Sequence, residues 1–128
     1  MKIIIDAMSG DNAPGEIIKG AVLAHRTYGA DIVLAGAERT VREHLRALDA
    51  AEDAGITVAD AAEVIGMHDD PSTAVRRKKQ SSMAVALGLL KDGAGDAVIS
   101  AGNTGALLAG ATLLVKGSTA SAARPWPR

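Results

Sequence analysis

The chain has 128 residues, of which 48% are hydrophobic and 2% aromatic, and its formal net charge is −1. Scarce aromatic rings argue against base stacking on single-stranded nucleic acid, and the balanced charge gives no general attraction to nucleic acid or membrane. Cysteine is absent, which excludes disulfides, thiolate metal sites and a cysteine nucleophile. No apolar run could span a bilayer, and the first residues do not resemble a signal peptide, so a cytoplasmic protein is expected.

Short apolar runs alternate with helical patterns along the chain. Strands are expected at residues 2–6, 31–36, 56–60 and 96–102. A first helix is expected from an N-cap at Asn12 to a stop at Gly29, and a second over 40–55. Residues 61–92 are expected to be helical with breaks near 69–72 and 79–82, and a last helix is expected over 104–117. This alternation of strands and helices predicts an α/β fold in three layers (α/β/α), with a mainly parallel sheet between two layers of helices. Residues 1–116 are expected to form part of an α/β domain, and residues 117–128 an irregular tail.

Two glycine-rich polar loops follow the first and fourth strands. The first holds Asp6, Gly10, Asp11 and Asn12, and the second Ser100, Gly102, Asn103, Thr104 and Gly105. With a strand order of 3-2-1-4, both loops would face one crevice beyond the carboxyl ends of the strands. Backbone N–H groups at helix N-termini attract anions there, which suggests a phosphate site. Ordinary turns with helix caps are the alternative interpretation for each loop.

A basic segment lies between these loops, with Arg76, Arg77, Lys78 and Lys79 followed by Ser81 and Ser82. Four adjacent cations cannot share one helix face, so some of them face solvent. The cluster suits a phosphate or an acidic partner. Ser81 and Ser82 are expected to cap the next helix or to contact a ligand.

Named nucleotide motifs are missing from the sequence. Glu16 stands where a P-loop needs lysine, and G-x-G-x-x-G does not occur. Glu38, after the second strand, is a weak candidate for a ribose-binding acid. The segment around His68 has no second cluster with the spacing of metal ligands, so no metal is predicted.

Three segments, "IDAMSGDNAP", "AVRRKKQSSMAVAL" and "VISAGNTGALLAG", resemble in order and spacing the bacterial phosphate acyltransferases of the PlsX type. This resemblance covers residues 1 to about 115 and implies a fold similar to isopropylmalate dehydrogenases. It implies formation of acyl phosphate from acyl-[acyl carrier protein] and orthophosphate for phospholipid synthesis, without metal or organic cofactor. It also implies a homodimer with peripheral membrane contact through a C-terminal part beyond this sequence.

The resemblance carries over to individual residues at the positions that match its three segments. Substrate-binding roles are expected for Asp6, Gly10, Asp11, Asn12, Arg76, Arg77, Lys78, Lys79, Ser81, Ser82, Ser100, Gly102, Thr104 and Gly105, and a catalytic role for Asn103. Ser9 departs from the family, which usually has glycine there. The family also continues beyond this chain, so a truncated product is expected. Two alternatives to the acyltransferase remain open: a non-catalytic fragment, and a binding domain like that of phosphotransacetylases or dehydrogenases.

Overall fold

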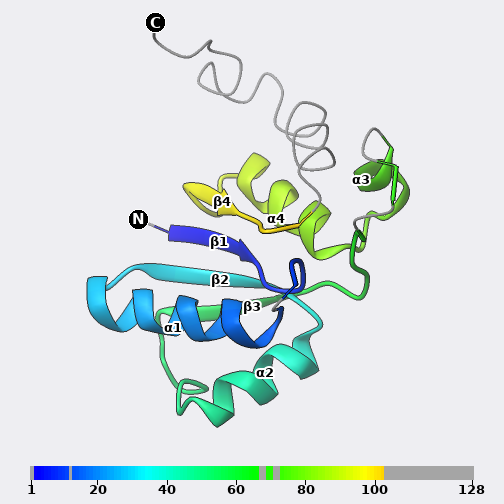
Figure 1. Cartoon of the computed structure of the whole chain (residues 1–128). Helices are drawn as coiled ribbons and strands as arrows, with labels where there is room; N and C mark the ends of the chain where they lie inside the picture. The colour runs from blue at the N-terminus through cyan, green and yellow to red at the C-terminus, as the bar shows by residue number, and fades with distance from the viewer. Residues whose placement is uncertain (1, 12, 67–68, 71–72, 103–128) are drawn as a thin grey trace, which may run out of the picture.

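A four-stranded parallel sheet forms the centre of the computed structural model, which describes residues 2–11, 13–66, 69–70 and 73–102 (Figure 1). The elements in chain order are β1 (Lys2–Asp6), α1 (Gly15–Tyr28), β2 (Asp31–Gly36), α2 (Glu38–Ala47), β3 (Ile56–Asp60), α3 (Ala74–Arg77), α4 (Ser82–Lys91) and β4 (Ala97–Ile99). The strand order is β3-β2-β1-β4, which is the order that the shared crevice of the two glycine-rich loops requires. Ile5 of β1 is in register with Ile99 of β4, which brings the ends of these two strands side by side.

Both faces of the sheet are covered by helices, as an α/β/α arrangement requires. On one face Ile5, Ile32 and Leu34 pack with apolar residues of α1 and α2. On the other face Ile4 and Val33 pack with Ala86 of α4. Because successive strand residues point to opposite faces, strands covered on both sides are apolar throughout. This explains why the strands of this chain do not alternate between polar and apolar residues.

The helix boundaries differ from the predicted ones in three places. Helix α1 begins at Gly15 with Pro14 at the N-cap, so the predicted N-cap at Asn12 was wrong; Asn12 itself lies outside the described residues. Helix α2 ends at Ala47 rather than near 55, because the chain turns at Asp49, whose φ is +55°. Residues 61–66 are not helical: Ala61 N–H donates to Gly36 O, and Glu63 forms a parallel bridge with Ser81. Gly29, with φ +69°, ends α1 as predicted.

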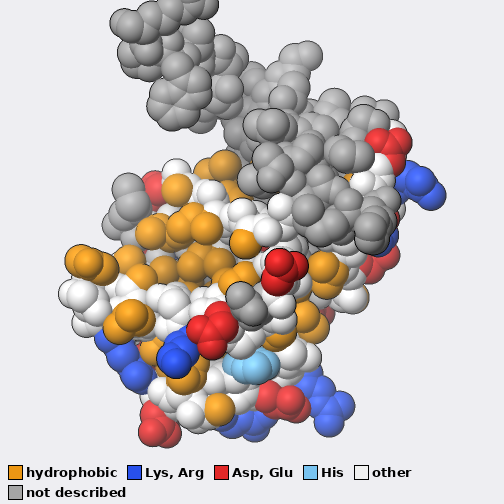
Figure 2. Space-filling view, in the orientation of Figure 1, with side chains coloured by type: hydrophobic (Ala, Val, Ile, Leu, Met, Phe, Trp, Pro, Cys, Tyr) orange, Lys and Arg blue, Asp and Glu red, His pale blue; other side chains and the backbone are white. Residues whose placement is uncertain are grey.

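Hydrophobic side chains gather on the face of the molecule where β1, β4 and α1 lie (Figure 2). Leu23 of α1 is 66% exposed and Ile99 of β4 is 53% exposed. The core residues, in contrast, lie between the sheet and its helices, with Ile4, Ile18, Ile32 and Leu34 almost fully buried. Stability should therefore depend on the sheet residues and little on Leu23.

We expect Leu34→Ala to lower the free energy of unfolding by about 2–5 kcal/mol, because it removes buried methyl groups and leaves a cavity between β2 and its covering helices. The matched control is Leu23→Ala, which should change it by at most about 0.5 kcal/mol. Urea unfolding followed by circular dichroism measures both values. Equal losses for the two variants would contradict this assignment of the core.

Candidate functional site

The buried carboxyl group of Asp6 joins the loop after β1 to the loop after β4. Asp6 is fully buried, and its Oδ2 accepts hydrogen bonds from Ser9 Oγ at 2.6 Å and Ser100 Oγ at 2.9 Å. Its Oδ1 accepts from the backbone N–H of Met8 at 3.3 Å. Ser100 Oγ in turn accepts from Gly102 N–H at 3.2 Å. One side chain at the end of β1 thus fixes the paths of both loops.

Two glycines allow these loops to approach closely. Gly10 has φ +106°, and a Cβ there would lie 3.1 Å from the Cβ of Ala101. A Cβ at Gly102 would lie 2.6 Å from the Cβ of Ser9, closer than real Cβ contacts permit. Ser9, where the family resemblance leads us to expect glycine, does not have a positive φ. Its side chain is therefore accommodated without backbone strain, and its hydroxyl contributes a hydrogen bond to Asp6.

A cavity of about 290 Å³ lies between the two loops and the chain that follows β3. Its position, beyond the carboxyl ends of the neighbouring strands β1 and β4, is where open α/β sheets bind ligands. The described residues that line it are Met8, Ser9, Gly10, Asp11, Val64, Ile65, Gly66, Ala101 and Gly102.

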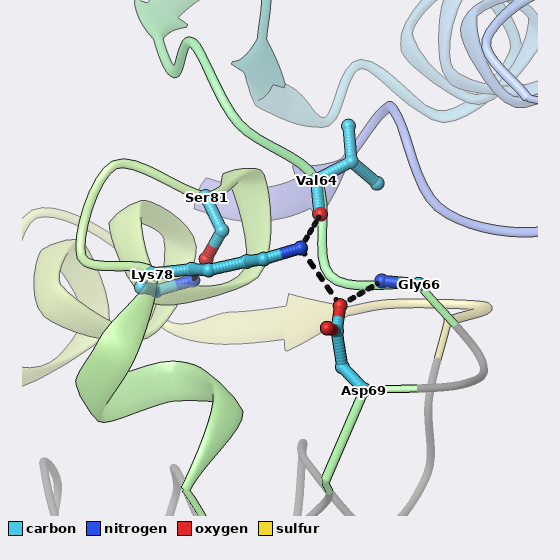
Figure 3. Close-up of polar contacts among 6 residues, drawn as sticks. Val64, Gly66, Asp69, Lys78 and Ser81 are labelled. Carbon is cyan, nitrogen blue, oxygen red and sulfur yellow. Dashed lines mark hydrogen bonds and ion pairs between the residues drawn. The ribbon is translucent and has the colours of Figure 1, made fainter.

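The segment Val64–Gly66, which follows β3 and lines the cavity, is held in place by Lys78 (Figure 3). Its Nζ donates to Val64 O at 3.2 Å and to Asp69 Oδ2 at 2.9 Å. The same carboxylate oxygen accepts from Gly66 N–H at 2.7 Å. The hydrogen bond from Lys78, and after it the one from Gly66, hold the pKa of the Asp69 carboxyl below its usual value. Lys78 therefore shapes the wall at Val64–Gly66.

The start of α4 lies beside this wall. Ser81 is its N-cap, and Ser81 Oγ accepts from Ala84 N–H at 3.1 Å, so the predicted cap is confirmed. The next residue, Ser82, is fully buried and donates its backbone N–H to Glu63 O at 2.9 Å. Its Oγ has no hydrogen-bond partner among the described residues. The backbone contacts at Glu63 and Ser82 hold the wall from a second side.

The remaining predicted residues divide into three groups. Arg77 and Lys79 are exposed and do not line the 290 Å³ cavity, although Arg77 lines a separate one of about 160 Å³ together with Asp69, Asp70, Thr73, Ala74 and Lys78. Arg76 lies in α3, but its side chain is outside the described part. Asn12, Asn103, Thr104 and Gly105 lie outside the described residues, as do residues 117–128.

Sequence reasoning missed Ser9 as a partner of Asp6, and it missed Asp69 and the wall at Val64–Gly66. Ser9 lies three residues after Asp6, a spacing that suits a local side-chain bond and could have been used. No sequence signal pairs Asp69 with Lys78, because the contact forms across a loop and an irregular turn.

None of the described helices is long and apolar enough to cross a membrane. Within the same part of the chain, no group of three or more His, Asp or Glu side chains is placed to hold a metal ion.

Asp6→Ala should lower the free energy of unfolding by about 1–3 kcal/mol, because it removes the oxygen that accepts both serine hydroxyls and leaves Ser9 and Ser100 without this acceptor. Amide hydrogen exchange should rise at Gly102, whose N–H depends on Ser100. The control Asp92→Ala, at an exposed residue at the end of α4, should leave both measurements unchanged. Unaltered exchange at Gly102 in Asp6→Ala would contradict the bridging role.

The Lys78–Asp69 contact predicts a defined pH dependence. Because the pKa of Asp69 is lowered by folding, the contribution of this contact is complete above the unfolded value of about 4 and is lost as pH falls through the lower folded pKa. The amide resonance of Gly66, which donates to Asp69, should therefore titrate with a midpoint below about 4 in an NMR titration. Lys78→Met should raise this midpoint, and Lys79→Met, at an exposed neighbour, should not. A midpoint that is the same in both variants would refute the contact.

The chain is similar in sequence to proteins named phosphate acyltransferases. The phosphate acyltransferase of Trichlorobacter lovleyi is 47% identical over 116 residues, which cover 91% of this chain and 33% of the relative. That of Geobacter sulfurreducens is 46% identical over 116 residues, with the same coverage. That of Anaeromyxobacter dehalogenans is 46% identical over 123 residues, or 96% of this chain and 34% of the relative. The chain spans about a third of the length of these curated relatives.

A family model described as "Fatty acid synthesis protein" matches residues 1–125. The match includes all described elements and both loops of the cleft. The chain therefore belongs to the fatty acid synthesis protein family.

Proposed function

We propose that this chain carries part of a phosphate acyltransferase, which transfers an acyl group from acyl carrier protein to orthophosphate for phospholipid synthesis. The observation that carries the proposal is the cleft itself: two glycine loops after β1 and β4, tied by Asp6, in a chain whose relatives are named phosphate acyltransferases. The cleft lies where α/β sheets bind ligands, and its loops approach so closely that a ligand can meet the backbone.

The reaction needs positioning more than a protein nucleophile. A phosphate oxygen attacks the thioester carbonyl and forms a C–O bond, and the C–S bond then breaks. The leaving thiolate on the carrier protein takes up a proton from solvent, and the acyl group remains on phosphate. A protein accelerates such a step by holding the two reactants together and by stabilising the oxyanion with preorganised donors.

Several of the predicted residues then have a role in the proposal. Asn103, Thr104 and Gly105, which lie outside the described residues, would bind phosphate or the carbonyl oxygen. Asp6 would orient Ser9 and Ser100 rather than attack, which agrees with its burial and its three hydrogen bonds. Arg77 and Lys79 are exposed and would meet an acidic carrier protein.

The family resemblance supports three finer proposals about the whole enzyme. It is a homodimer in the cytoplasm, it contacts the membrane peripherally through the length that the relatives have beyond this match, and it uses no cofactor. Gel filtration with light scattering tests the first, and flotation with phospholipid vesicles tests the second.

The proposed activity can be tested by a chimera in which residues 1–116 replace the matching third of the T. lovleyi enzyme. We expect acyl phosphate from acyl-[acyl carrier protein] and orthophosphate, trapped by hydroxylamine as a hydroxamate. In the chimera, Asn103→Ala should lower the rate about tenfold or more, since it removes a preorganised donor. Leu23→Ala, at an exposed residue that does not line the cleft, is the control.

Circular dichroism and thermal unfolding must first establish that the chimera folds. A folded chimera that forms no acyl phosphate would overturn the proposed function. A folded Asn103→Ala chimera with unchanged turnover would overturn only the role of that residue.

A further inference from the structure

The two adjacent serines at the start of α4 differ in how their hydroxyl groups are used. Both residues are fully buried. Ser81 Oγ accepts from Ala84 N–H at 3.1 Å and so caps the helix. Ser82 Oγ has no hydrogen-bond partner in the part of the chain that the structure describes. A buried hydroxyl without a partner destabilises a folded protein, so the fold gains nothing from the hydroxyl of Ser82.

The backbone at the same helix start also has an unused donor. Ser82 N–H donates to Glu63 O at 2.9 Å. The hydroxyl of Ser81 takes up Ala84 N–H. Between these two amides, Met83 N–H has no acceptor among the described residues, although Met83 is fully buried. Two donors in consecutive residues, one hydroxyl and one amide, thus stand without an acceptor in a site that water does not reach.

The position of these donors favours a negatively charged acceptor. They lie at the N-terminus of a ten-residue helix, where the macrodipole is positive. The first turn of α4 contains no acidic side chain that would offset this partial charge. An anionic oxygen could accept from both donors, and it would be stabilised by the helix as well.

The start of α4 lies directly behind the cleft. Ser82 is bonded to Glu63, and the next residue, Val64, lines the cavity of about 290 Å³. Met83 packs against the loop after β4, since a Cβ at Gly102 would lie 3.3 Å from Met83 Cε. Gly102 is itself part of the cavity lining and is half-buried. Displacement of this one loop would therefore open the helix start to a ligand in the cavity.

We propose that the start of α4 is an anion subsite of the cleft, at which Ser82 Oγ–H and Met83 N–H donate to oxygen atoms of orthophosphate when the loop at Gly102 moves aside. The proposal rests on the proposed function for the identity of the anion. It separates the roles of two serines that look equivalent in the sequence: Ser81 builds the end of the helix, and Ser82 binds the substrate.

Thermal unfolding of the 128-residue chain without ligand tests the difference between the two serines. Ser81→Ala removes the helix cap and should lower Tm by about 4 °C. Ser82→Ala removes a hydroxyl that has no partner, so it should leave Tm unchanged or raise it. A loss of Tm in Ser82→Ala as large as that in Ser81→Ala would overturn the proposal, because the hydroxyl of Ser82 would then stabilise the fold.

A titration of the same chain with inorganic phosphate, followed by the NMR amide resonance of Met83, tests the subsite itself. Phosphate should shift this resonance downfield and saturably, because the amide gains an anionic acceptor. Ser82→Ala should weaken phosphate binding about tenfold, since one hydrogen bond to a charged group is lost. Thr27→Ala, which deletes a hydroxyl at an exposed residue of α1, is the matched control and should bind phosphate as the wild type does. The neutral thioester S-butyryl-pantetheine should leave the Met83 resonance in place.

Three results of this titration would overturn the proposal: a Met83 resonance that phosphate does not move, an unchanged affinity in Ser82→Ala, or a saturable shift of Met83 by the neutral thioester. None of them depends on acyl-phosphate formation. Phosphate binding at Met83 together with an inactive chimera would leave the subsite standing while the proposed function fails. An active chimera whose Met83 resonance does not respond to phosphate would have the reverse meaning.

Discussion

The hydrogen bonds to the carboxyl group of Asp6 link two segments that are 94 residues apart in the sequence. The parallel sheet brings the ends of β1 and β4 together, but it does not fix the loops that follow them. Ser9 and Ser100 do so by donating to the same oxygen atom, and Gly102 then bonds to Ser100. This buried acceptor therefore determines how closely the two loops approach, and with them the shape of the cavity that they line.

The wall at Val64–Gly66 is held by a different kind of interaction. Lys78 and Asp69 form a partly exposed ion pair, which on the surface contributes little to stability by itself. The ion pair matters more for the position of the backbone than for stability, because the same two side chains also bind the backbone at Val64 and Gly66. The sequence of the basic segment suggests a phosphate site, but one of its cations, Lys78, instead holds the wall of the cavity in place. The exposed Arg77 and Lys79 stay available to a partner.

The fold was largely predictable because apolar runs and helix periodicity report burial directly. The four strands, their parallel arrangement and the cap at Ser81 follow from local sequence and from general rules of α/β folds, whereas the strand order was a condition that the structure meets. The extended path of residues 61–66 was not predictable, since it depends on the distant partners Gly36 and Ser81. The positions of the two glycine loops could be inferred, because each loop follows a strand. The role of Asp69 could not be inferred, and neither could the finding that no Lys or Arg is among the described residues that line the cavity. The roles assigned to Asn103, Thr104 and Gly105 stay predictions.

The contact between positions 9 and 102 restricts which side chains these two positions of the chain can carry. A Cβ at position 102 would overlap the space that the Cβ of Ser9 fills, so the two positions share one volume. A side chain fits at one of them only while the other is glycine. A Ser9→Gly variant should therefore accept a small side chain at position 102 better than this chain does, because only the flexible end of Met83, at 3.3 Å, would then lie close to the new Cβ. Substitutions at these two sites should be strongly epistatic, and their effects should not add.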